Sequence, residues 1–403
     1  MGLVILIILV IFITIIDKKI YGTYYTPSVM LSFPFLLICI LYDLNAENLG
    51  FYPLNYNVLF IWVFGIIIFW LTGIFTNLII KVKANSGVKI DRKKEIYFYS
   101  NKIVNFSFIV SLILSYYLIN AFQLYNSSGG DAVEEYLGGG FQGHLIIVLK
   151  LVSTLSFISL LGKGNKIFKL KNLYVVCVAL SLAVLYATKS GVLILLLSYF
   201  FSWILFFNKK IKILYVAIFF GLGFGIFYVS YSMVFGYLAP VDFIWSHMIM
   251  YYVSGTAGMN AYFSQTNIVG VDPELLYRYF FNLFYTITGN QSEVKTVISD
   301  LWTNIGNGYT INVKTFFGTI YVYGGEVLGT MTVIYFSFIT HLVFKLSKIN
   351  FMALVLYTHL LAMLCFGWFD LYFNSVLFYE SIIIAFILSF ILIANKQNER
   401  KFQ

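Results

Sequence analysis

Long apolar segments recur from one end of the chain to the other, and they constrain the fold more than any other feature of the sequence. A hydrocarbon core about 30 Å thick needs a helix of about 20 apolar residues to cross it. Of the 403 residues, 60% are hydrophobic and only 11% are charged, whereas a soluble domain carries about 25% charged residues. We therefore predict an all-α, polytopic membrane protein that forms a single transmembrane helical domain over residues 1–403.

The hydropathy pattern predicts about eleven transmembrane helices, within a range of ten to twelve. The apolar N-terminus has no basic residue before it, so we expect a retained first span and not a cleaved signal peptide. The three cysteines lie in apolar runs without a CxxC pair, which argues against a disulfide framework. The expected spans are residues 2–16, 27–42, 56–80, 103–125, 144–162, 173–188, 190–207, 212–236, 325–345, 351–370 and 375–394.

Basic residues decide the expected orientation. With the C-terminus in the cytoplasm, 21 of the 26 Lys and Arg residues fall in cytoplasmic loops, as the positive-inside rule requires. The N-terminus is then outside, residues 81–102 are cytoplasmic, and residues 237–313 form a large extracytoplasmic loop. The net charge of +9 is explained by the cytoplasmic loops, so we expect no nucleic-acid partner.

The loop at residues 237–313 is much longer than packing requires, so it is the expected location of function. Asp272-Pro273 is typical of a helix start, and an amphipathic helix over residues 274–288 is expected to lie on the membrane surface. Residues 243–263 are apolar but broken by Gly255 and Gly258, which suggests a half-inserted or surface-lying segment and not a complete span. Gly318, Gly324, Gly325 and Gly329 predict a break or close approach before the next span begins.

The segment Asn312-Val-Lys-Thr-Phe-Phe-Gly-Thr-Ile-Tyr-Val-Tyr-Gly-Gly-Glu-Val-Leu-Gly329 resembles the N-x-x-T-F-x-x-x-Y-x-D-x-G-x-x-G stretch of Wzy-type O-antigen and capsular polysaccharide polymerases. The layout of many spans with one long, late outer loop is also similar to that family. The turn Thr188-Lys189-Ser190-Gly191 falls where the family often has a Ser-Arg-Gly/Thr turn. Two departures are the Lys at position 189 and the absence of the family's Asp near Gly324.

This resemblance implies a glycosyltransferase in the bacterial cytoplasmic membrane that polymerises oligosaccharide repeat units on its outer face. The implied substrate is an oligosaccharide carried on polyprenyl pyrophosphate, with membrane lipids and a chain-length regulator protein as further partners. The sequence has no Asp-x-Asp, P-loop or GxGxxG motif after a strand, and its four histidines show no metal-binding spacing. We therefore expect no cofactor, no metal, and a donor that is already activated as a pyrophosphate.

Cations are scarce on the outer side, so Lys189, Arg278 and Lys314 are the candidate pyrophosphate ligands. The alternatives are snorkelling of Lys189 to the interface and an i,i+4 pair between Arg278 and Glu274. Trp302 and Tyr309 are candidate sugar-stacking residues, or ordinary interfacial aromatics.

An acceptor hydroxyl also needs a group that takes its proton. The catalytic candidates are His247, Asp300 and Glu326. Glu326 lies at the outer start of a span, and its alternative role is an ion pair with Lys314 or an interfacial position. Glu380, deeper in the last span, is interpreted as structural, with a tyrosine hydroxyl or a helix-terminal amide as its expected partner.

Two other functions stay open from the sequence. The first is a lipid-linked oligosaccharide flippase or secondary transporter, which should show repeated halves and polar residues near mid-membrane. We find no such repeat, and the polar residues cluster on the outer side. The second is an O-antigen ligase, which shares the long late loop and cannot be distinguished from a polymerase by composition.

Overall fold

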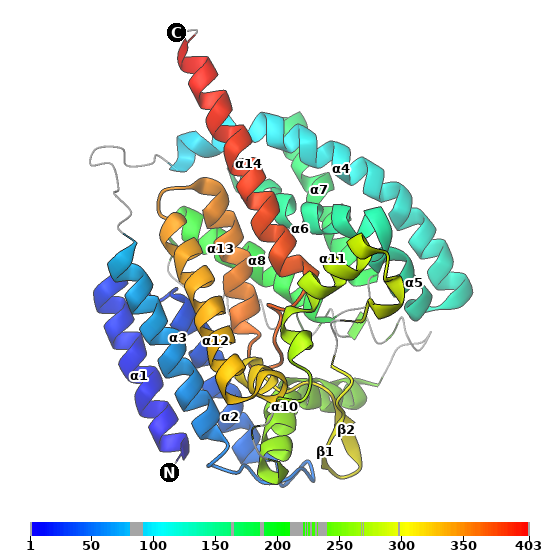
Figure 1. Cartoon of the computed structure of the whole chain (residues 1–403). Helices are drawn as coiled ribbons and strands as arrows, with labels where there is room; N and C mark the ends of the chain where they lie inside the picture. The colour runs from blue at the N-terminus through cyan, green and yellow to red at the C-terminus, as the bar shows by residue number, and fades with distance from the viewer. Residues whose placement is uncertain are drawn as a thin grey trace. The chain divides into compact units, whose positions relative to one another are not determined.

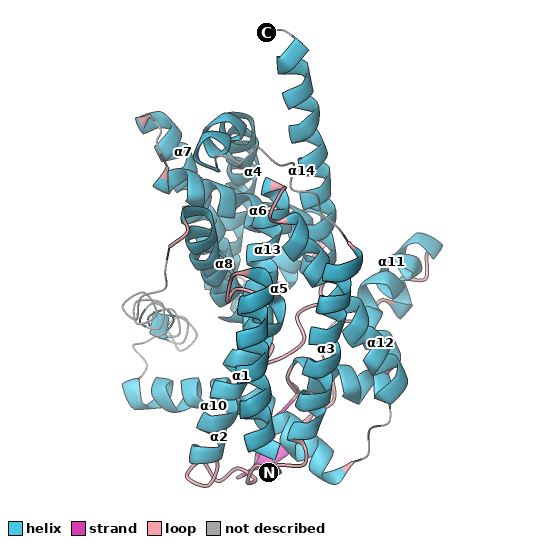
Figure 2. Ribbon diagram, turned by 90° about the vertical axis from the view of Figure 1, so that its left-hand side faces the viewer, coloured by secondary structure: helices cyan, strands magenta, loops and turns pink. Residues whose placement is uncertain are grey.

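The computed structural model describes residues 2–80, 92–162, 165–185, 189–209, 221, 223, 225, 228–229, 232, 240–266, 268, 270–296 and 299–401. For residues 92–102, 130–131, 189, 242–243, 246 and 391–401 only the backbone is described. The predicted spans at 173–188 and 212–236 therefore lie partly outside the described residues. Helices make up most of the described chain (Figure 2).

The chain forms two compact units. The first contains Met1–Val82, His247–Lys345 and Met363–Tyr379, and the second contains Lys83–Ser246, Leu346–Ala362 and Glu380–Gln403. The elements that lie wholly or mostly in the first unit are α1 (Gly2–Tyr21), α2 (Pro27–Asn45), α3 (Leu59–Ile79), α10 (Val241–Gln265), η1 (Pro273–Tyr277), α11 (Arg278–Thr288), η2 (Gln291–Glu293), β1 (Thr303–Gly306), β2 (Tyr309–Ile311) and α12 (Phe316–Leu346). The remaining helices, which lie wholly or mostly in the second unit, are α4 (Arg92–Ser128), α5 (Gly130–Gly138), α6 (Gly140–Leu161), α7 (Lys166–Leu185), α8 (Lys189–Phe207), α13 (Phe351–Cys365) and α14 (Val376–Lys401).

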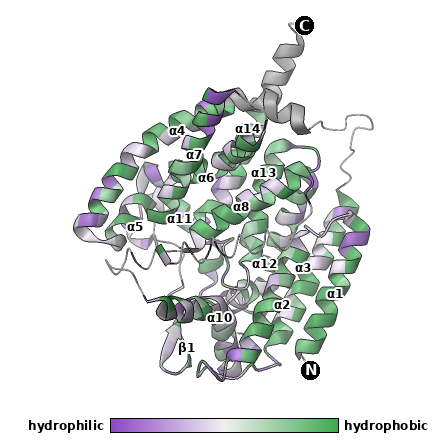
Figure 3. Ribbon diagram, turned by 180° about the vertical axis from the view of Figure 1, so that it is seen from behind, coloured by the Kyte–Doolittle hydropathy of each residue, from purple (hydrophilic) through white to green (hydrophobic). Residues whose placement is uncertain are grey.

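Apolar helices of membrane-spanning length confirm the predicted class, a multi-pass helical membrane protein (Figure 3). Within the described residues, seven helical segments are long and apolar enough to cross a bilayer. They are Pro27–Asn45, Leu59–Ile79, Ile103–Ser128, Gly140–Leu161, Lys166–Leu185, Ser190–Phe207 and Phe316–Leu346. Phe351–Cys365 and Val376–Phe390 are shorter apolar helices, and α1 carries Asp17, Lys18 and Lys19 near its end. The total of eleven spans stays a prediction.

In the first unit, helices α1, α2 and α3 pack side by side, and α12 packs against α3 (Figure 1). The Ser337 hydroxyl of α12 donates a 2.5 Å hydrogen bond to the Phe69 carbonyl oxygen of α3. Between α2 and α3, the rings of Phe35 and Trp62 stack with centroids 3.5 Å apart. Aromatic stacking and an interhelical hydrogen bond therefore fix α3, whose N-terminal end helps to form the candidate site.

In the second unit, α4, α6 and α7 pack against one another, and α8 packs against α6 and α7. His359 of α13 lies between the Thr154 hydroxyl, 2.9 Å from Nε2, and the Ser198 hydroxyl, 3.3 Å from Nδ1. Such hydrogen bonds hold apolar helices together inside a membrane. Glu380 pairs with His144 at 2.8 Å, so the expected tyrosine or helix-terminal amide partner was wrong.

Three local expectations for residues 237–313 are corrected by the structure. Residues 241–265 form one uninterrupted helix, α10, although Gly255 and Gly258 suggested a break. A 3₁₀ turn precedes α11, so the predicted helix at 274–288 begins as an α-helix only at Arg278. The fold is also not purely helical, because β1 and β2 form a short antiparallel hairpin.

The amphipathic character predicted for residues 274–288 is present in α11. Phe280, Phe284 and Ile287 are exposed on this helix, Ile287 to 76%. The 3₁₀ turn before it buries Leu275 and Leu276. An exposed apolar face of this kind fits a helix that lies in the membrane interface, which stays a prediction.

Candidate functional site

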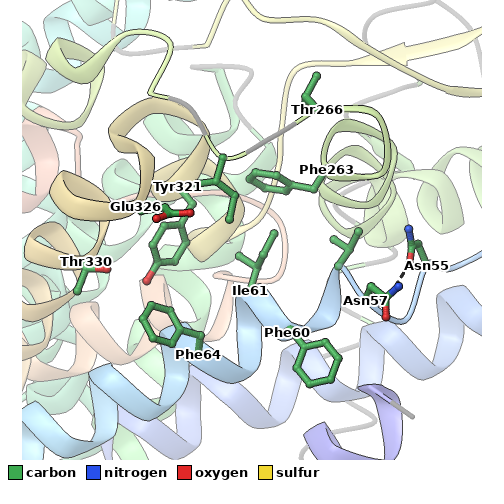
Figure 4. Close-up of a pocket in the computed structure, with 12 residues that line it drawn as sticks. Asn55, Asn57, Phe60, Ile61, Phe64, Phe263, Thr266, Tyr321, Glu326 and Thr330 are labelled. Carbon is green, nitrogen blue, oxygen red and sulfur yellow. Dashed lines mark hydrogen bonds between the residues drawn. The ribbon is translucent and has the colours of Figure 1, made fainter.

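A cavity of about 740 Å³ lies within the first unit. Its walls come from the start of α3 and the turn before it, from the C-terminal end of α10 with the residues that follow, and from the middle of α12 (Figure 4). The apolar lining consists of Val58, Phe60, Ile61, Phe64, Phe263 and Ile268. The polar lining consists of Asn55, Asn57, Thr266, Tyr321, Glu326 and Thr330.

A break in α12 shapes one wall of this cavity. Gly325 has φ 63° and ψ −164°, a conformation that is essentially restricted to glycine. The helix runs up to this point and resumes with Glu326, so the break that the glycine-rich segment predicted is confirmed. As a result, Tyr321 before the break and Glu326 after it line the same cavity (Figure 4).

Glu326 brings the negative charge to the cavity. Its side chain is exposed, and within the described residues it forms no ion pair. The ion pair with Lys314 that the sequence left open is therefore not formed. The Glu326 carboxylate is available to accept a hydrogen bond or a proton from a bound molecule.

The asparagine pair on the opposite wall is held in a defined conformation. The Asn55 amide group donates to the Ser264 hydroxyl at 3.1 Å, and its oxygen accepts from the backbone N–H of Asn57 at 3.0 Å. The backbone N–H of Asn55 donates to Asn260 at 2.7 Å. The exposed Asn57 side chain is left to face the cavity, where its amide can both donate and accept.

A strained residue marks the start of α12. Thr315 has φ 67°, which is unusual for a β-branched residue. Its hydroxyl oxygen accepts from the Trp62 indole N–H at 3.0 Å and from the Gly318 backbone N–H at 3.2 Å. The second of these bonds caps the helix. Such strain persists only where the surroundings fix the conformation, and it is found often at functional sites.

Lys314 is fully buried just before this cap. Its ammonium group donates to the Leu301 carbonyl oxygen at 2.7 Å and lies 5.8 Å from the centroid of the Tyr262 ring. Burial lowers the pKa of Lys314 to about 8, and the nearby Asp370 acts in the opposite direction. Lys314 therefore ties the segment before the hairpin to the start of α12.

Asp370, half-buried in the loop between α13 and α14, belongs to the same polar group. Its carboxylate accepts from the Thr319 hydroxyl at 2.6 Å and from the Leu371 backbone N–H at 2.8 Å. Burial raises the pKa of Asp370 to about 6, although Thr319, the backbone N–H of Leu371 and the charge on Lys314 lower it. The carboxyl group can thus exchange a proton near neutral pH.

Arg278 is buried and paired with two carboxylates. Nη2 lies 2.6 Å from Asp272, and Nη1 lies 3.5 Å from Glu274. The i,i+4 pair with Glu274 was one of the two sequence interpretations and is confirmed. Asp272 does not cap the following helix as expected, because its carboxylate accepts a hydrogen bond from Arg278. Nε of Arg278 is buried and has no hydrogen-bond partner among the described residues.

The remaining predicted residues whose side chains are described do not line the cavity. Trp302 and Tyr309 flank and form the β-hairpin and are exposed to 62% and 43%. Asp300 is exposed two residues before Trp302, and His247 is half-buried in α10. Lys189 begins α8, and its side chain lies outside the described residues. Of the predicted catalytic residues, the structure thus brings only Glu326 to the cavity.

Sequence reasoning missed Asn57, Tyr321 and Asp370. Asp370 was placed at the end of a predicted span over 351–370, but α13 ends at Cys365 and leaves the carboxyl group in a loop. The Trp368-Phe369-Asp370 order, in which a charge follows two aromatic residues, is the signal that could have marked a span end. Tyr321 lies in the motif segment, but the break at Gly325 was needed to direct it to a cavity.

Residues 50–399 match a family of unknown function, DUF6337, and the chain belongs to that family. No curated protein and no solved structure matches the chain.

Proposed function

We propose that this protein is a metal-independent glycosyltransferase that polymerises oligosaccharide repeat units carried on polyprenyl pyrophosphate. The reaction takes place at the outer face of the bacterial cytoplasmic membrane and supplies a surface polysaccharide, either O-antigen or capsule. One observation carries the proposal. The segment that resembles the polymerase motif contains a glycine break, and this break brings the free carboxylate of Glu326 and the ring of Tyr321 to one cavity.

The lining of the cavity suits the proposed substrate. Aromatic and aliphatic side chains accommodate the apolar faces of sugar rings and the neighbouring lipid, while amides and hydroxyls can bond sugar hydroxyl groups. Phe60 and Phe64 are large exposed apolar residues at the start of α3, an apolar helix of membrane-spanning length. A cavity with this mixed lining at an apolar helix suits the sugar part of a lipid-linked substrate.

The proposed chemistry is a single displacement of pyrophosphate. The oxygen of an acceptor hydroxyl forms a bond to the anomeric carbon of the donor sugar, and the bond from that carbon to the pyrophosphate oxygen breaks. Polyprenyl pyrophosphate leaves with the bonding electron pair. Glu326 accepts the hydroxyl proton, because it is the carboxylate that faces the cavity.

The proposed pyrophosphate ligands are Lys189, Arg278 and Lys314. Arg278 and Lys314 are buried and already bonded to Asp272 and the Leu301 carbonyl oxygen. Either residue would have to exchange a protein partner for a phosphate oxygen during the reaction. In the absence of such an exchange, these two residues hold the loop in place.

Electrophoresis of surface glycan from a deletion strain tests the proposal. We expect single repeat units transferred to the final acceptor without a ladder of longer chains. A ligase defect would instead leave polymer on the carrier lipid, and a flippase defect would leave units inside the cell. Either of those outcomes, or a wild-type ladder, would overturn the polymerase assignment.

Complementation then tests the role of Glu326. Glu326→Gln should fail to restore the ladder, while Glu293→Gln should restore it, since Glu293 is exposed in η2 and does not line the cavity. Immunoblots of both variants control for protein level. A full ladder with Glu326→Gln would remove this residue from the proposed mechanism.

A further inference from the structure

The charge on the described lining of the cavity is negative. Among its described lining residues the single ionised group is the Glu326 carboxylate, and none is Lys, Arg or His. Arg278 and Lys314 are the cationic residues closest in sequence to the cavity-lining residues. They are 2% and 0% exposed, respectively, and are already bonded to other protein groups. No described lining residue thus neutralises the charge on Glu326, and this charge would repel an anion placed in the cavity.

The other lining groups can hold an uncharged polar molecule. Asn57 offers both a donor and an acceptor, and the Asn55 bonds fix the turn that carries it. The ring of Tyr321 lies beside Glu326, and Phe263 faces the same space (Figure 4). Rings of this kind pack against the C–H faces of sugars, and against cations more strongly than against neutral groups.

We infer that the cavity binds an uncharged or amino-bearing sugar and excludes acidic sugars and the pyrophosphate group. The inference deepens the proposed function and rests on it for the identification of the ligand as a saccharide. An ammonium group on the sugar would lie near the Glu326 carboxylate and the aromatic rings. The pyrophosphate of the donor must then lie outside this cavity, so the cavity holds the acceptor end of the reaction.

Thiol labelling of the full-length protein measures the electrostatic part of this inference without any glycan. Asn57→Cys places a thiol on the wall of the cavity, and the parent chain is used to subtract labelling of the native cysteines, of which Cys177 is exposed. We expect a cationic methanethiosulfonate to react faster than an anionic one, by roughly fivefold for one nearby charge. Adding Glu326→Gln should bring the two rates together, while adding Glu293→Gln should not.

Protection from an uncharged maleimide measures the choice of saccharide. The probes are glucosamine at mildly acidic pH, N-acetylglucosamine and glucuronic acid. We expect glucosamine and N-acetylglucosamine to slow labelling of Asn57→Cys, with glucosamine the more effective, and glucuronic acid to have little effect. Glu326→Gln should remove the advantage of glucosamine.

The outcomes separate this inference from the proposed function. Equal rates with both methanethiosulfonates, or better protection by glucuronic acid, would overturn the inference whatever the glycan ladder shows. A wild-type ladder in the deletion strain, with the charge preference and the saccharide protection intact, would overturn the polymerase assignment and leave a saccharide-binding cavity. Loss of the preference in Glu293→Gln would place its source away from the cavity and would also contradict the inference.

Discussion

The hydroxyl of Thr319 donates a 2.6 Å hydrogen bond to the carboxylate of Asp370, which is 51 residues away in the chain. Two backbone bonds run beside it, because the N–H groups of Thr315 and Phe316 donate to the carbonyl oxygens of Phe369 and Gly367. The start of α12 is thus fixed against the loop after α13. The strained Thr315 and the glycine break that shapes the cavity belong to the same anchored segment.

The Asp370 carboxyl group should make stability depend on pH. Burial raises its pKa to about 6 in the folded protein, from 3.8. Between about pH 4 and 6 the Asp370 carboxyl group therefore binds a proton more tightly in the folded state than in the unfolded state. The resulting stabilisation of the folded state, about 2–3 kcal/mol, is lost as pH rises through 6. Asp370→Asn lacks this dependence. We expect the stability of wild type relative to Asp370→Asn to fall by that amount from pH 4 to pH 7, as measured by unfolding in detergent.

Two variants control for this pH effect. Asp300→Asn removes an exposed aspartate from the same unit and should leave the difference from wild type nearly constant with pH. Thr319→Val removes a hydrogen bond that lowers the pKa of Asp370, so it should extend the loss of stability to higher pH. A constant difference between wild type and Asp370→Asn would show that the carboxyl group is not protonated preferentially in the folded protein.

The conformation of Gly325 can be tested against a second glycine of nearly equal geometry. Gly325 has φ 63° and ψ −164°, and Gly129, before α5, has φ 85° and ψ −176°. A side chain is strained at both positions by about 1–3 kcal/mol. We expect Gly325→Ala and Gly129→Ala to lower the melting temperature alike, but only Gly325→Ala to change labelling of Asn57→Cys and the glycan ladder. Equal effects on both readouts would mean that the break has no specific role in the cavity.

Close packing of α10 gives a prediction about stability alone. A Cβ added to Gly255 would lie 2.3 Å from the Phe369 carbonyl oxygen and 2.4 Å from that of Trp368. Backbone cannot move aside as a flexible side chain can, so Gly255→Ala should destabilise the protein by about 1–3 kcal/mol or prevent its accumulation. Gly221→Ala is the control, because the space around Gly221 is open. Unchanged melting of Gly255→Ala would contradict the close approach.

The sequence predicted those features that depend on neighbours along the chain. Apolar segment length indicated the membrane class, the glycine cluster indicated a break before residue 326, and the spacing of Glu274 and Arg278 indicated their ion pair. Each of these follows from residues within a single continuous segment of the chain, from about one turn for the ion pair to about 20 residues for a span. Glu326 became a catalytic candidate for the same reason, because its place at the outer start of a predicted span can be read from the neighbouring residues.

Features that depend on distant partners were missed or misinterpreted. Gly255 was interpreted as a helix breaker, but its role is to admit the backbone of residues 368–369. A glycine in an apolar segment is compatible with either role, and only the partner decides between them. Asp272 likewise looked like a helix cap, and Asp370 drew no attention because Thr319 is remote in sequence.

The orientation in the membrane is the prediction on which the proposed function most depends. With 21 of 26 basic residues assigned to the cytoplasm, η2 should face outwards and the start of α7 inwards. Ser292→Cys and Lys169→Cys place thiols at exposed positions in these two elements, in a chain that also carries Cys177→Ser. We expect a membrane-impermeant maleimide to label Ser292→Cys in cells with an intact cytoplasmic membrane, and Lys169→Cys only after that membrane is permeabilised. The reverse pattern would put the loop containing α11 and the hairpin in the cytoplasm, where lipid-linked repeat units that have already been flipped could not reach Glu326.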